Sequence, residues 1–150
     1  MKNAPKGWLR INPVVVYHEA AAAIDWLCRV FDFQVRLKVE DDDGRIVHCE
    51  LVYGDGVIMP AQEGGGASAA LLSNAASPKS LGGKFTQSLC LYVDDVEAHC
   101  KKARAGGATI FYEPKVSDYG DDHWADKSYG AIDLEGHYWW FSERIRDPKS

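Results

Sequence analysis

The chain has 150 residues and a formal net charge of −5, with 46% hydrophobic and 26% charged residues. These values are typical of one soluble globular domain that buries roughly two-thirds of its unfolded surface. The acidic balance and scattered basic residues argue against nucleic-acid binding, which needs a basic stripe. No apolar run approaches the ~20 residues of a membrane span, and the cysteines form no CxxC pair. We therefore expect a cytoplasmic protein with no membrane partner.

The first half of the chain predicts a β-α-β-β-β module. Its first strand is rich in β-branched residues, and its helix carries apolar side chains at helical spacing. The next two strands form a predicted hairpin around the turn sequence DDDG. The predicted elements are a strand at 11–19, a helix at 20–33, and strands at 34–40, 45–54 and 57–63.

A stretch rich in Gly, Ala and Ser, about residues 64–84, predicts a linker. After it the pattern begins again, with glycines closing the second helix as a stop signal. The predicted elements are a strand at 86–95, a helix at 96–107, a strand at 108–114, a loop at 115–128 and strands at 129–135 and 136–143. This repetition of pattern predicts two tandem βαβββ modules.

The ordered set of segments at 11–33, 44–59, 89–110 and 129–141 resembles the vicinal oxygen chelate superfamily. That superfamily includes glyoxalases, extradiol dioxygenases and bleomycin-resistance proteins. The resemblance implies an α+β fold in which two βαβββ modules form curved mixed sheets around a central cavity. We expect one domain over 1–150, with module one at about 10–63, the linker at about 64–84 and module two at about 85–143.

In the superfamily's metalloenzymes, four positions that face the cavity hold a divalent cation through His, Gln or Glu. The resemblance carries these positions to Asn12, Met59, Ser88 and Trp140 in this sequence. Asn and Ser are poor ligands for such ions, Met is soft, and Trp has no lone pair to give. We therefore expect no metal and no cofactor at these positions.

The last strand carries aromatic residues on both faces. Alternation sends Tyr138 and Trp140 to the cavity, while Trp139 and Phe141 pack under the second helix. His137, at the entry of this strand, is expected to bond to the preceding turn rather than to a metal. A superfamily ligand position occupied by an indole predicts a pocket with aromatic walls.

Two other groups of residues are candidates for function. His48 and Glu50 lie two apart on one strand, so they form either an acid–base or ligand pair, or a polar pair on the exposed side of the sheet. Trp124, beside His123 in the predicted loop, either contacts a planar or cationic ligand or packs as a plug on the core. His99 lies in the second helix and is expected on its flank.

Three hypotheses for function follow. The first is a metal-free protein that binds a small planar or aromatic molecule in an apolar cavity. The second is a lyase, isomerase or dioxygenase of the same superfamily, using displaced metal ligands or the His48/Glu50 pair. The third is a structural or interaction subunit whose pocket is filled by its own side chains. The candidate ligand-binding residues are Asn12, Met59, Ser88, Tyr92, Trp124, Tyr138, Trp140, His48 and Glu50. The resemblance also implies a homodimer.

Overall fold

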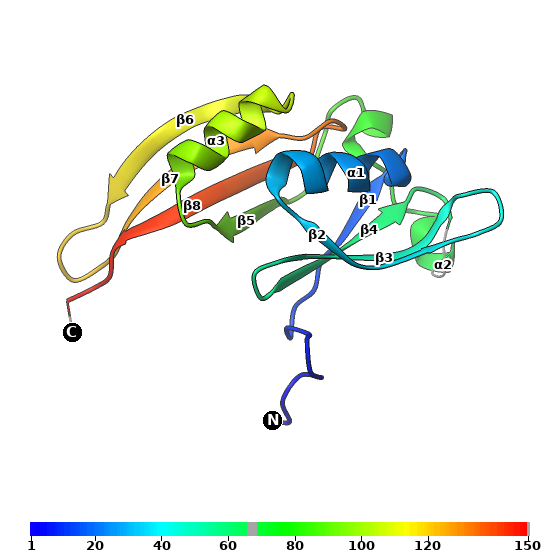
Figure 1. Ribbon diagram of the computed structural model, residues 1–150, viewed down its shortest axis with the longest axis horizontal. Coiled ribbons are helices and arrows are strands. Elements are labelled where there is room, and N and C mark those ends of the chain that lie inside the picture. Colours follow the sequence, from blue (N-terminus) through cyan, green and yellow to red (C-terminus); the bar gives the residue numbers. More distant parts are fainter. Residues whose placement is uncertain (66–68, 150) are drawn as a thin grey trace. The chain divides into compact units, whose positions relative to one another are not determined.

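A computed structural model of the protein describes residues 1–65 and 69–149. It contains two compact units, Met1–Lys84 (unit 1) and Phe85–Ser150 (unit 2). The elements are β1 (Val14–Tyr17), α1 (Ala20–Phe31), β2 (Gln34–Glu40), β3 (Ile46–Tyr53), β4 (Gly56–Gln62), α2 (Ala69–Leu72), the 3-10 helix η1 (Pro78–Leu81), β5 (Ser88–Tyr92), α3 (Val96–Ala105), β6 (Thr109–Asp118), β7 (Ala125–Ile132) and β8 (Tyr138–Arg146). Figure 1 shows these elements along the chain.

Unit 1 has a four-stranded mixed sheet in the order β1-β4-β3-β2. β1 pairs with β4 in parallel, and the other neighbours are antiparallel. α1 packs on one face of this sheet (Figure 1), because its apolar side chains recur at helical spacing. The buried apolar residues of α1 include those that the sequence pattern predicts: Ala23, Ile24, Leu27, Val30 and Phe31.

Unit 2 repeats this arrangement, with the sheet order β5-β8-β7-β6 and α3 on one face. Asp95 caps α3, since its carboxylate accepts the backbone N–H of Ala98 at 2.9 Å. The fold is therefore α+β, with two tandem βαβββ modules, as the sequence predicts. We call the side of each sheet opposite its helix the open face. A shared cavity within one domain stays a prediction.

The two faces of the unit 2 sheet divide the aromatic residues of β8 as alternation predicts. Trp139 and Phe141 are fully buried, and the ring of Phe141 lies 4.5 Å from that of His99 on α3. Tyr138 and Trp140 are half-buried and belong to the open face. The core of unit 2 and its candidate site therefore use adjacent residues of one strand.

Two expectations from the sequence were wrong. His99 is 6% exposed rather than on the flank of α3, and its Nδ1 lies 2.6 Å from the hydroxyl of Tyr129. This hydrogen bond satisfies a polar group inside an otherwise apolar interface. Residues 115–118 and 125–128, predicted as loop, extend β6 and β7 as paired strands. Ladder hydrogen bonds outweigh the turn-like composition there, and a shorter loop at 119–124 remains.

The predicted linker contains short ordered elements. α2 and η1 lie within it, while residues 66–68 of this prediction lie outside the described residues. The hydroxyl of Ser77 caps η1 by accepting the backbone N–H of Lys79 at 3.3 Å. Both short helices belong to unit 1, which extends to Lys84.

Candidate functional site

The open face of unit 2 carries a cluster of aromatic rings, which we call the aromatic patch: Phe85, Phe111, Tyr138 and Trp140. Phe85 stacks on Tyr138 with 4.1 Å between ring centroids. The ring of Phe111 lies 4.8 Å from Tyr138 and 5.2 Å from Trp140. Phe85 and Phe111 remain 44% and 38% exposed, so the patch presents aromatic surface that a planar molecule can stack against.

A polar network lies at the other end of this face. Arg144 donates from Nε to Asp126 at 2.5 Å and from Nη2 to the hydroxyl of Tyr92 at 2.8 Å. The same hydroxyl donates to Asp126 at 3.0 Å. The guanidinium lies 5.4 Å from the Tyr92 ring centroid and 5.7 Å from that of Trp124. These contacts hold two exposed aromatic rings beside a fixed cation.

The ionisation of this network follows from its contacts. Burial raises the pKa of the Tyr92 phenol, and its hydrogen bond to Asp126 adds to that increase. Hydrogen bonding to Asp126 raises the pKa of Arg144. Arg144 therefore stays cationic and Tyr92 stays a neutral donor at physiological pH.

A short row of small polar side chains connects the two ends. The hydroxyls of Ser128 and Ser142 lie 2.8 Å apart, and Cys90 Sγ lies 3.9 Å from Ser142 Oγ. Strand register pairs Cys90 with Trp140 and Ser88 with Tyr138. Ser88 and Cys90 are both exposed. The face thus changes from aromatic to polar along the strands.

The open face of unit 1 has a different chemistry. Arg36 donates from Nε to Glu50 Oε2 at 2.7 Å, and His48 Nε2 lies 2.9 Å from Glu50 Oε1. The side chain of Glu50 is only 10% exposed. The Arg36 guanidinium also lies 4.4 Å from the ring centroid of Trp8 and donates to the carbonyl of Gly7. His48 and Glu50 therefore form the predicted pair, with Arg36 as a third member.

This network fixes the charge of Glu50. The hydrogen bond from His48 and the nearby Arg36 hold the pKa of the Glu50 carboxyl below its usual range. Near neutral pH Glu50 is thus an anion that orients the His48 ring, and not a proton donor. A hollow of about 360 Å³ beside Arg36 is lined by Gly7, Trp8, Leu9, Arg36, Val52, Gly54, Asp55 and Val57.

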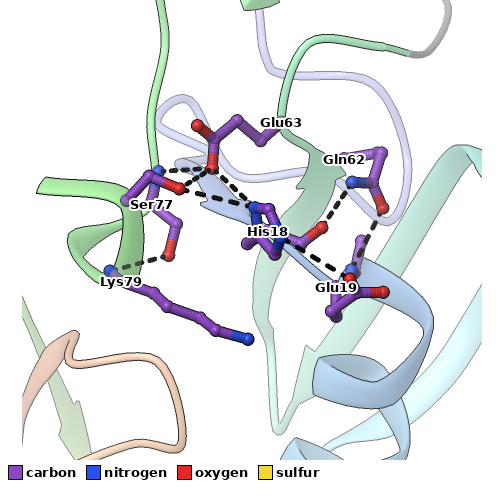
Figure 2. Close-up of polar contacts among 8 residues, drawn as sticks. His18, Glu19, Gln62, Glu63, Ser77 and Lys79 are labelled. Carbon is purple, nitrogen blue, oxygen red and sulfur yellow. Dashed lines mark hydrogen bonds and ion pairs between the residues drawn. The ribbon is translucent and has the colours of Figure 1, made fainter.

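A larger hollow, of about 610 Å³, lies where β1 and β4 end in unit 1. Figure 2 shows Glu63 turned toward η1, where its Oε2 accepts the Ser80 hydroxyl at 2.7 Å and the Ser77 N–H at 3.3 Å. Gln62 joins the end of β1 to α1 by donating to the His18 carbonyl at 2.6 Å and accepting the Ala20 N–H at 3.2 Å. Glu63 thus anchors η1 and Gln62 anchors the start of α1, so both side chains have a structural role.

The structure brings together some of the predicted residues and separates others. His48 pairs with Glu50, Tyr92 and Trp124 share Arg144, and Tyr138 and Trp140 share Phe111. Asn12 and Met59 belong to unit 1, whereas Ser88 belongs to unit 2. The sequence reasoning missed Phe85, Arg36, Phe111, Asp126 and Arg144. Continuing the alternation of β8 from Tyr138 to residues 142 and 144 identifies Arg144, but no simple pattern identifies Phe111.

Comparison with known proteins identifies the family. The sequence profile of the Glyoxalase/Bleomycin resistance protein/Dioxygenase superfamily matches residues 10–148. The chain belongs to this superfamily. Uncharacterised proteins of Mycobacterium bovis and Mycobacterium tuberculosis H37Rv are each 30% identical to it over 143 residues. These matches cover 91% of this chain and 84% and 75% of the two relatives, respectively.

Solved structures are also similar to this chain. TioX from Micromonospora sp. ML1 aligns with a TM-score of 0.70 and 28% identity, over 92% of this chain and all (100%) of TioX. A glyoxalase/bleomycin resistance protein/dioxygenase family enzyme from Burkholderia phytofirmans PsJN has a TM-score of 0.62 and 18% identity, over 89% and 97% of the two chains. The second likeness supports the fold alone.

Metal chemistry is common in the glyoxalase superfamily, and the metal-ligand positions of its enzymes correspond to Asn12, Met59, Ser88 and Trp140. Val14 pairs with Met59, and Asn12 lies two residues before Val14. In the same way, Cys90 pairs with Trp140, and Ser88 lies two residues before Cys90. Asn12 donates to the Leu9 carbonyl at 2.5 Å, and its buried Oδ1 has no hydrogen-bond partner among the described residues. Trp140 contributes an aromatic ring without a donor lone pair. These residues do not fit a divalent metal.

Within residues 1–65 and 69–149, no three His, Cys, Asp or Glu side chains group as a metal site requires.

None of the helices within residues 1–65 and 69–149 has the length and apolar character that a membrane crossing needs.

Proposed function

We propose that the chain binds a small planar or aromatic molecule on the open face of unit 2, without the metal of the superfamily's enzymes. The observation that carries the proposal is the aromatic patch, whose rings make stacked, tilted and edge-on contacts with one another yet are partly exposed. Stacked aromatic surface favours flat ligands over bulky aliphatic ones. Arg144, Tyr92 and Trp124 supply a polar end that orients the ligand.

Binding is tested with two planar probes of opposite charge, proflavine and naphthalene-2-sulfonate, and with cyclohexanesulfonate as the non-planar control. We expect a planar probe to raise the melting temperature, because a ligand of the native state stabilises it. The Trp140→Ala variant is expected to lose this shift. Equal shifts with planar and non-planar probes, or none with any probe, contradict the proposal.

Cysteine labelling locates the bound probe. Cys90 is exposed on the proposed binding face, whereas Cys49 is buried in unit 1 and burial raises its pKa to about 11. We expect a thiol reagent to modify Cys90 first and a bound planar probe to slow that reaction. An unchanged rate for Cys90 at saturating probe argues against binding on this face.

Metal analysis of the purified protein is a separate test of the metal-free proposal. We expect no stoichiometric Fe, Ni, Mn, Co or Zn and no rise in melting temperature when these ions are added. One bound ion per chain that is lost in the His48→Ala or Glu50→Ala variant contradicts the proposal and favours a displaced metal site.

A second candidate function is acid–base catalysis by His48, as a lyase, isomerase or dioxygenase of the superfamily. The specific observation is the 2.9 Å contact with Glu50, whose other oxygen is held by Arg36. A buried anion that orients a half-exposed imidazole is a common arrangement for a general base. Turnover of hemithioacetals or catechols that falls in the His48→Gln variant supports this candidate, and absence of turnover removes it.

The remaining proposals concern assembly and setting. We propose a cytoplasmic homodimer of one domain per chain, which follows the superfamily resemblance. Light scattering after size-exclusion chromatography measures the mass, and a monomer at all concentrations contradicts the dimer.

A further inference from the structure

The centre of the aromatic patch contains a notch above Gly130, and the ring of Phe111 occupies it. A Cβ atom built on Gly130 lies 2.3 Å from Cζ of Phe111 and 2.7 Å from both Cε atoms. The far end of the ring thus uses the space that any larger residue at position 130 would fill. Register pairs Gly130 with Trp140, so the notch lies beside Trp140 on the open face.

The backbone of β6 explains why Phe111 reaches this notch. Ile110 pairs with Ala131 and Tyr112 pairs with Gly130, so Phe111 is an extra residue without a partner in the ladder. Such bulges redirect side chains and are common beside functional sites. As a result, the consecutive residues Phe111 and Tyr112 both have rings 5.2 Å from that of Trp140.

The contacts that hold Phe111 in the notch are apolar. Its side chain has no polar atom, so its departure breaks no hydrogen bond, and it is already 38% exposed. Its ring contacts are tilted or edge-on contacts to Tyr138 and Trp140, the same surfaces that a planar ligand would use. A ligand ring can therefore replace each of these contacts in kind.

We propose that Phe111 is an internal occupant of the notch above Gly130 and that an aromatic ring of the ligand displaces it. This inference rests on the proposed function, because it assigns the position that the ligand's ring takes. Phe111 is then a specificity-determining residue, because only a flat six-membered ring can compete with it for the notch. This competition lowers the apparent affinity of every ligand. A bulky aliphatic group cannot reproduce the contacts that Phe111 gives up.

Three variants test the displacement with naphthalene-2-sulfonate as the probe, followed by titration calorimetry. Phe111→Ala opens the notch, so we expect about tenfold tighter binding than in the wild type. Phe85→Ala is the matched control, because it removes another exposed ring of the patch without opening the notch; we expect weaker binding. Adding Gly130→Ala to Phe111→Ala refills the notch, and we expect the gain to disappear.

The outcomes separate this inference from the proposed function. If the wild type binds the probe but Phe111→Ala weakens binding as much as Phe85→Ala does, Phe111 is a fixed wall and the displacement is refuted, while the proposed function stands. If no variant binds any planar probe, both are refuted. Tight binding that survives in the Phe111→Ala/Gly130→Ala variant also refutes the notch as the ring position.

A measurement on the wild type keeps the test independent of variant folding. The free protein is expected to show NOEs between the Phe111 ring and the Gly130 α-protons, which saturation with the probe removes. NOEs that persist in the saturated complex refute displacement.

Discussion

The open faces of the two units have the same strand order and different chemistry. Both lie opposite a helix on a four-stranded sheet with matching strand order. In unit 1 this face carries an ionic network in which Arg36 and His48 each contact the carboxylate of Glu50. In unit 2 it carries the aromatic patch, whose polar partners lie at one end. A duplicated module can therefore keep its helix-facing core and change the opposite face without altering the fold.

The largest expected effect distinguishes the two faces of unit 2. Trp139 is fully buried and its indole N–H donates to Asp133 at 3.1 Å, so Trp139→Ala is expected to cost about 3–5 kcal/mol of unfolding free energy. The adjacent Trp140 is half-buried, and Trp140→Ala is expected to cost less, about 1 kcal/mol. Urea unfolding measures both, and equal losses would mean that the open face is part of the core.

An intermediate effect is expected in unit 1. Arg36→Ala leaves the carboxylate of Glu50, 10% exposed, without its cation, at a cost of about 2 kcal/mol. The probe affinity of unit 2 is expected to stay unchanged. The double variant Arg36→Ala/Glu50→Ala serves as the control, since removing both charges is expected to cost less than the sum of the single changes. Additive losses would show that the two side chains do not interact.

The smallest effect is a dependence of stability on pH. The pKa of Glu50 is lowered from 4.5, first by the hydrogen bond from His48 and then by Arg36. Because the pKa of Glu50 is lower in the folded state, its ionised carboxylate contributes fully to stability above pH 4.5. This contribution is lost as the pH falls through the folded-state pKa. Glu50→Gln is therefore expected to lose less stability on acidification than the wild type does. Unfolding curves with parallel pH dependence in both proteins would contradict this assignment.

Sequence pattern predicted the fold well because the signals are periodic. The stripe of α1 and the alternation of β8 each depend on burial of one face, and tertiary packing reinforces both. The pairing of His48 with Glu50 followed from the same alternation. Boundaries were less predictable: residues 115–118 and 125–128 have a composition typical of turns, yet hydrogen bonding to a neighbouring strand makes them β-structure.

The candidate site and the core of unit 2 were each predicted only in part, because the positions of Phe111 and His99 do not follow from spacing. Phe111 reaches the open face through a bulge, which changes which side of the strand a residue faces. His99 looks like a flank residue until Tyr129, thirty positions along the chain, supplies its buried partner at 2.6 Å. Both features depend on contacts between strands or between a helix and a strand, which no local pattern encodes.

The turn before β8 has a consequence for folding fidelity. The buried carboxylate of Asp133 accepts the backbone N–H groups of Glu135 and His137, both at 3.0 Å, and the indole N–H of Trp139. One carboxylate thus ties the turn to a side chain inside the following strand. A slip of one residue that put Trp140 in the buried position would move Trp139 to the open face. Asp133 therefore helps to fix the register of β8 that places Trp139 in the core and Trp140 on the open face.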